Sequence, residues 1–100
     1  MPAHETQSDA IRAPERLVAE TRLDFRRVVL EALERLTLRG ASVIEIDLQD
    51  TREVDASGLG ILVLAQKRAA QAQLRTRLVR VPSEVRRILE LTRLDHLFEM

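Results

Sequence analysis

The chain has 100 residues, enough for one small domain with a modest core and too few for two. Sixteen basic residues balance sixteen acidic ones without a long run of either sign, which argues against a nucleic-acid binder and favours protein partners. Aromatic residues make up only 2%, so the core must be aliphatic, and the lack of cysteine excludes disulfides, a thiolate nucleophile and a cysteine-type zinc site.

The first residues are polar and lack the basic and apolar regions of a secretory signal. We therefore expect residues 1–10 to form a disordered tail and residues 11–100 to form the domain. The longest apolar run, residues 59–65, contains a glycine and is far shorter than the roughly 18 residues of a membrane span. These features predict a cytoplasmic protein without direct membrane insertion.

Residues 11–18 predict a short strand, which Pro14 restricts to a sheet edge because proline cannot donate to a ladder. Helical periodicity begins at Asp24. Thr21 or Asp24 can cap this helix, and Gly40 can end it. Its apolar stripe, at i, i+3, i+4 and i+7 spacing, comprises Phe25, Val28, Val29, Ala32, Leu33 and Leu36.

Residues 43–48 alternate in the manner of a half-buried strand. Ile44, Ile46 and Leu48 are expected on the buried face, with Val43, Glu45 and Asp47 on the partly wet one. A proline-free, alanine-rich run predicts a second helix over residues 57–73.

Residues 76–81 favour another strand, and Pro82 or Ser83 begins a third helix. Residues 94–98 are apolar enough to pack as a last helical turn. The alternation predicts an α/β fold with a small mixed, largely parallel β-sheet and helices packed mainly on one side.

Residues 54–60 read Val-Asp-Ala-Ser-Gly-Leu-Gly. They follow the strand predicted over residues 43–48 and open the second helix. Two glycines at a helix start suggest a phosphate cradle, but the spacing matches neither a dinucleotide fingerprint nor a P-loop. His4 and His96 lie far apart in sequence, and Asp55 has no evident carboxylate partner. We therefore predict no metal, no cofactor and no catalytic residue. Capping of the helix alone would explain both Asp55 and Ser57.

From about residue 15 onwards, the chain contains an apolar strand, the Asp-x-Ser-Gly-Leu-Gly loop, an alanine-rich helix, a strand and a helix ending in Leu-Thr-x-Leu-Asp-x-Leu-Phe. This arrangement resembles the STAS domain. The family takes its name from sulfate transporters and anti-sigma factor antagonists. Members often begin with a two-strand hairpin, whereas only residues 11–18 are available for one here.

The resemblance implies a non-enzymatic interaction module of the partner-switching kind. In antagonists of this type, an anti-sigma factor that is also a serine kinase phosphorylates the loop, and the phosphorylated antagonist lets go of it. The acceptor directly follows the aspartate, where this chain has Ala56, so Ser57 is a weak candidate for phosphorylation. The alternative is a STAS subunit of a membrane transporter, as in lipid-transport ATPases, or of a signalling scaffold, where phosphorylation is not needed.

Residues 59 and 61–65 are all apolar, more than one helix face can bury. Gly58, Leu62, Ala65 and Ala69 form one sheet-facing row, so the other apolar side chains must point elsewhere. Either they form a binding patch, or neighbouring elements such as Leu97 and Phe98 cover them. The predicted partner-binding residues are Asp55, Ala56, Ser57, Gly58, Leu59, Val63 and Leu64.

Overall fold

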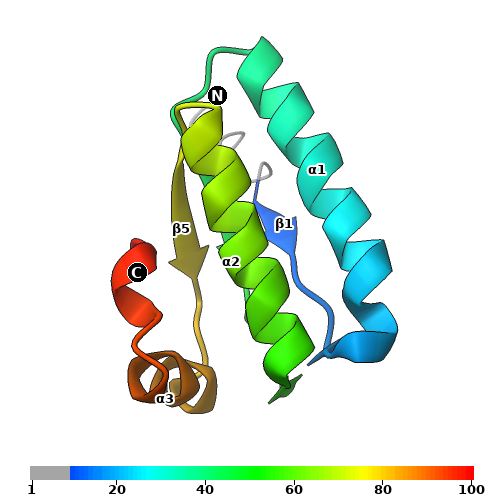
Figure 1. The fold of residues 1–100 in the computed structure, drawn as a ribbon, viewed down its shortest axis with the longest axis vertical. Coiled ribbons are helices and arrows are strands. Elements are labelled where there is room, and N and C mark those ends of the chain that lie inside the picture. Colours follow the sequence, from blue (N-terminus) through cyan, green and yellow to red (C-terminus); the bar gives the residue numbers. More distant parts are fainter. Residues whose placement is uncertain (1–9) are drawn as a thin grey trace, which may run out of the picture.

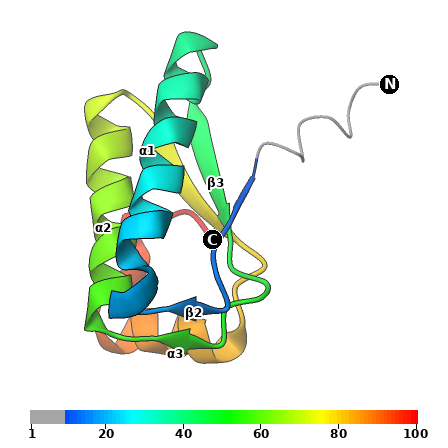
Figure 2. The ribbon, with the colours of Figure 1, turned by 90° about the vertical axis from the view of Figure 1, so that its right-hand side faces the viewer.

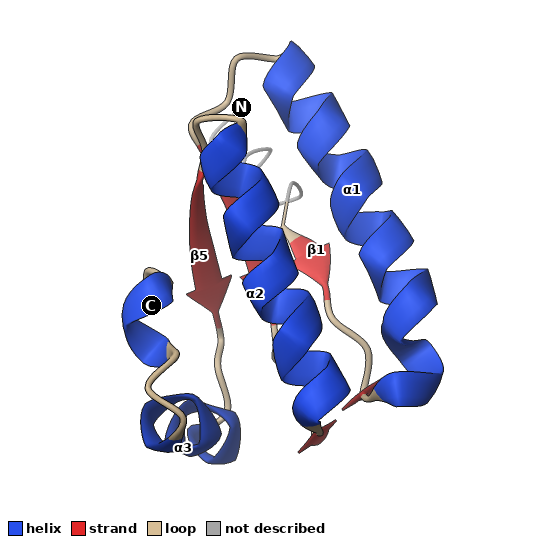
Figure 3. Cartoon of the chain, viewed as in Figure 1, coloured by secondary structure: helices blue, strands red, loops and turns tan. Residues whose placement is uncertain are grey.

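The structure is a computed structural model that describes residues 10–100, so nearly all of the predicted N-terminal tail lies outside the described residues. Figure 1 shows two long helices in front of a small sheet, and Figure 3 separates helices from strands by colour. The strands are β1 (Ile11–Arg12), β2 (Arg16–Leu17), β3 (Val43–Asp47), β4 (Glu53–Val54) and β5 (Arg75–Val79). The helices are α1 (Arg22–Leu38), α2 (Ala56–Gln71) and α3 (Ser83–Leu91), with short 3-10 turns η2 (Ala19–Thr21) and η3 (Asp95–Leu97).

The predicted α/β architecture is confirmed, and the sheet is divided in two. Three strands pair in the order β1-β3-β5, and β2 pairs with β4 as a separate two-stranded ribbon. All of these pairings are parallel. Helices α1 and α2 cover one face of the larger sheet, while α3 and the β2-β4 ribbon lie at one end of the molecule (Figure 2). The ribbon therefore sits beneath the start of α2.

The single edge strand predicted over residues 11–18 is two strands that pair with different neighbours. The chain bends between them at Pro14, where the loop after β3 holds it. The Thr51 hydroxyl donates to the Pro14 carbonyl at 2.8 Å, and the Arg52 amide donates to the Glu15 carbonyl at 2.8 Å. This bend moves the chain from the edge of β3 to β4, so the hairpin common in the family is absent from residues 10–100.

Helix α1 buries most of its predicted stripe, and one assignment was wrong. Val28 is exposed, because it lies at the margin of the stripe rather than over the sheet. The N-cap is Thr21, yet its side chain makes no capping bond and its hydroxyl donates instead to the Arg16 carbonyl at 2.6 Å. Gly40, with a φ of +73°, ends the helix as predicted, in a conformation that glycine adopts without strain.

Strand β3 buries Ile44, Ile46 and the following Leu48 as predicted. Asp47 was expected on the wet face and is instead buried. Arg80 donates to its Oδ2 from Nε at 3.2 Å and also from the terminal guanidinium nitrogen, and the Gln49 amide donates to Oδ1 at 2.9 Å. Burial by itself raises the pKa of Asp47, but the bonds from Arg80 and Gln49 outweigh it and hold that pKa below its ordinary value.

The C-terminal residues close the free edge of β5. Phe98 is buried in the core, and Glu99 forms a parallel bridge with Arg77. The Glu99 carboxylate pairs with Arg75 at 2.6 Å and with Arg77 at 3.2 Å. The predicted last helical turn is therefore the 3-10 turn η3, and the chain then extends along the sheet.

Candidate functional site

Asp55 joins three elements at the start of α2. It is the N-cap of that helix, with extended backbone angles, and its Oδ1 accepts from the Gly58 amide at 2.9 Å. Its other oxygen, Oδ2, accepts from the Ala19 amide at 3.1 Å, and its own amide donates to the Leu17 carbonyl at 3.3 Å. The carboxylate thus caps α2 and ties it to η2, and the backbone amide of Asp55 ties the same position to β2.

These contacts hold the pKa of Asp55 below its ordinary value. The Gly58 amide is the largest cause, burial opposes it, and the amides of Ala19 and Ser57 add to the lowering. The carboxylate is therefore ionised at neutral pH and occupied by backbone donors.

The shifted pKa predicts an acid-sensitive contribution to stability. Because the folded-state pKa lies below the unfolded value, Asp55 stabilises the fold above the unfolded pKa and loses that effect as the pH falls through the folded pKa. We expect Asp55→Asn to lower the melting temperature clearly at neutral pH and much less in strong acid. Asp24→Asn, which changes an exposed carboxylate on α1, is the matched control. Equal losses for Asp55→Asn at both pH values would contradict the assignment.

Ala56 and Ser57 lie in the first turn of α2, and both line a surface hollow between α1 and α2. Ala56 is exposed and Ser57 is half-buried. The capping role open to Ser57 belongs to Asp55 alone, and among the described residues the Ser57 hydroxyl has no hydrogen-bond partner. Because Ala56 is exposed, position 56 presents a methyl group at the protein surface.

The hollow beside Ala56 has a volume of about 640 Å³ and lies between the first turns of α1 and α2. Helix α2 contributes Gly60, Ile61 and Leu64 in addition to the first turn, and α1 contributes Arg22, Leu23 and Arg26. The floor is apolar and the α1 side carries two guanidinium groups. The sequence reading placed the candidate site on the loop and α2 only, although the i, i+4 spacing of Arg22 and Arg26 is a signal that they share a face.

The predicted sheet-facing row of α2 is confirmed, since Gly58, Leu62, Ala65 and Ala69 are all buried. Ile61 is also buried, at the floor of the hollow. The three apolar residues expected to point elsewhere, Leu59, Val63 and Leu64, are half-buried. Leu59 and Leu64 pack against the core cluster. Of these three residues, only Leu64 lines the hollow.

Metal binding and membrane spanning were also considered for the described residues. Within residues 10–100, no three His, Asp or Glu side chains gather closely enough to hold a metal ion. Nor does this part of the chain contain a helix with the length and apolar character to cross a bilayer.

The parallel β-α-β order, with an aspartate-capped helix start flanked by an accessible hollow, defines a small α/β domain of the STAS type. Comparison with protein families matches residues 3–99 to the family described as "Mlab, STAS domain", and the chain belongs to this family. Comparison with curated proteins gave no match.

Proposed function

We propose that this domain is a non-enzymatic interaction module that binds a protein partner through the start of α2. The observation that carries the proposal is the hollow beside the exposed Ala56, which combines an apolar floor with two arginines. An accessible apolar surface with charged residues at its rim is the usual make-up of a protein-binding site. Of the partner-binding residues proposed from the sequence, Ala56, Ser57 and Leu64 line this hollow, whereas Asp55, Gly58, Leu59 and Val63 do not.

The state of Asp55 supports a non-enzymatic role. An efficient general base has a pKa near the working pH. Both oxygens of Asp55 accept backbone amides, and its pKa is lowered. The carboxylate therefore shapes the loop rather than accepting protons.

The first partner class is an anti-sigma factor that is also a serine kinase, as the resemblance to anti-sigma factor antagonists implies. Ala56 has no hydroxyl to phosphorylate, so this protein would stay competent to bind its partner. A phosphate at this surface would add two negative charges, and the desolvation of those charges would oppose the complex.

A second class is a transporter subunit, in the manner of STAS proteins that accompany lipid-transport ATPases, or a signalling scaffold. Ala56 favours this class, because a permanent subunit has no need of a phosphorylation switch. Proteins of both classes that are encoded beside the gene for this domain can be purified and assayed for binding to it, which distinguishes the two classes. Failure of both a serine kinase and a transporter ATPase to bind would overturn the partner assignment.

Phosphorylation provides the direct test of Ala56. Wild type, Ser57→Ala and Ala56→Ser are incubated with the kinase and ATP, and their intact masses are measured. We expect one phosphate on Ala56→Ser only, because a displacement of about 1 Å from the reactive position can cost two orders of magnitude in rate. Ser57 is one residue out of register, which rotates its side chain by about 100° around the helix. One phosphate on wild type that is lost in Ser57→Ala would make Ser57 the switch.

A further inference from the structure

The seam between α1 and α2 holds two hollows, together termed the groove, of which the one beside Ala56 is the first. A second hollow of about 490 Å³ lies between the last turns of the same two helices. Leu30 and Leu38 of α1 and Arg68 of α2 are among its lining residues. The first turns of the two helices adjoin one another, as do the last turns, so α1 and α2 run parallel (Figure 1). The first hollow lies between the first turns and the second between the last turns.

The lining residues of both hollows follow one face of each helix. On α2 the seam is formed by residues 57, 61, 64 and 68, which follow the i, i+4, i+7, i+11 ridge of one helix face. On α1, positions 26, 30, 34 and 38 repeat at i+4. Helix α2 has 16 residues, so the groove extends over about 24 Å at 1.5 Å per residue. That length suits a third helix laid along the other two.

The α1 side of the groove exposes large apolar side chains at both of its ends. Leu23 is 68% exposed beside the first hollow, and Leu38 is 84% exposed beside the second. Between them, Leu30 and Leu64 are half-buried and packed against the core. An apolar strip with exposed leucines at both ends is suited to the apolar stripe of a helix.

The charges differ between the two halves. Arg22 and Arg26 line the first half, none of its lining residues is acidic, and neither arginine has an ion-pair partner among residues 10–100. The ionised Asp55 carboxylate caps the amino end of α2 and offsets the partial positive charge of that end, so the two arginines supply the positive charge of this half. The second half is lined by one acidic and one basic residue, Glu34 of α1 and Arg68 of α2, so its lining carries no net charge.

We propose that the groove between α1 and α2 holds an amphipathic helix of the protein partner, whose apolar stripe faces the leucines and whose acidic residues lie beside Arg22 and Arg26. The inference rests on the proposed interaction function and specifies the partner's chemistry. The acidic half of the partner helix lies next to Ala56, so a phosphate at position 56 would repel it. Charge complementarity of this kind sets both the orientation and the choice of partner.

The test uses two designed 18-residue, alanine-rich peptides that share a leucine stripe and differ in charge. One carries glutamates in one half and glutamines in the other, and the second has lysines in place of the glutamates. Binding to the full chain is followed by amide chemical shifts in ¹H-¹⁵N spectra. We expect the acidic peptide to shift residues along both halves of the seam and to bind about tenfold more tightly than the lysine peptide.

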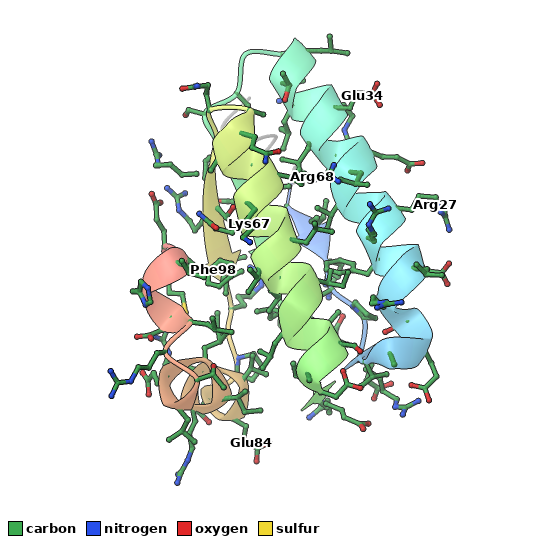
Figure 4. The ribbon with its side chains drawn as sticks, viewed as in Figure 1. Arg27, Glu34, Lys67, Arg68, Glu84 and Phe98 are labelled. Carbon is green, nitrogen blue, oxygen red and sulfur yellow. The ribbon has the colours of Figure 1, made fainter. Side chains whose placement is uncertain are left out.

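Charge reversal on α1 provides the matched control. Arg26→Glu should weaken the acidic peptide about tenfold, whereas Arg27→Glu, whose side chain points away from α2 (Figure 4), should change its affinity less than about twofold. Both variants change the net charge equally, and thermal melts verify that both are folded. The pair of Arg27 with Asp24 is exposed and contributes little.

Several results would overturn the inference: no detectable binding of the acidic peptide, equal affinity for both peptides, or shifts confined to other surfaces. A concentration-dependent dimer in sedimentation that Leu38→Glu abolishes would show that a second copy occupies the groove instead. If an intact partner protein binds beside Ala56 and Arg26→Glu leaves its affinity unchanged, the helix assignment fails while the proposed function stands.

Discussion

Gly58→Ala is expected to remove a large share of the free energy of unfolding, whereas Gly60→Ala, two residues further along the same helix, should make the protein more stable. A β-carbon at Gly58 would lie 1.9 Å from the carbonyl oxygen of Leu17 and 2.8 Å from its carbonyl carbon. Both are backbone atoms, and that oxygen accepts the Asp55 amide. Relief of the clash must therefore separate α2 from β2. Overpacking that shifts the backbone costs about 1 to 3 kcal/mol, out of the roughly 5 to 15 kcal/mol that stabilises a domain, and a clash this close belongs at the upper end of that range.

Gly60 supplies the contrast. It lies in the same helix, is exposed, and a β-carbon there would meet nothing within 4 Å. Alanine is preferred to glycine inside a helix, so Gly60→Ala should raise stability by about 0.5 to 1 kcal/mol. Urea titrations of the two variants and wild type measure both effects. Equal stability of Gly58→Ala and wild type would contradict the close approach of α2 to β2.

The sequence alone does not distinguish the roles of Gly58 and Gly60. Their spacing excludes a phosphate cradle, but it does not indicate which of the two is needed for packing. Gly58 is required by the β2-β4 ribbon, whose four residues are too few to produce a recognisable strand pattern. The contact between Gly58 and Leu17 arises from tertiary packing of segments about forty residues apart, which local propensity does not encode.

The alternation of apolar and polar residues was sufficient to predict which face of a strand or helix is buried. The alternation of Ile44, Ile46 and Leu48 placed β3 and its buried face correctly, and the small-residue row of α2 faces the sheet as predicted. Asp47 was misplaced because its burial depends on Arg80, which is distant in sequence.

The candidate site was only half predicted, for a related reason. Asp55, Ala56 and Ser57 follow from the motif, and the cap formed by Asp55 is confirmed. The α1 side of the groove could not be located without knowing that α1 and α2 run parallel with their first turns side by side. Once that arrangement is known, Arg22 and Arg26 complete the hollow.

Leu62→Asp is expected to unfold the domain, and Leu64→Asp to leave it folded but unable to bind its partner. Leu62 is fully buried between α2 and the sheet. Removal of a buried leucine side chain costs about 2 to 5 kcal/mol, and a carboxylate without a partner in that position adds several more. The sum approaches the whole stability of a domain this size. An aspartate at position 64 can instead reach water through the hollow that Leu64 lines.

Circular dichroism melts distinguish the two variants. Leu62→Asp should show no cooperative transition at 25 °C or above, while Leu64→Asp should melt cooperatively at a lower temperature than wild type. Binding of Leu64→Asp to a partner should be strongly weakened, because a new negative charge replaces apolar surface at the edge of the hollow, in the place where the partner's acidic residues are proposed to lie. Loss of cooperative folding in Leu64→Asp as well would mean that Leu64 belongs to the core and that the groove between the first turns of α1 and α2 is not an independent surface.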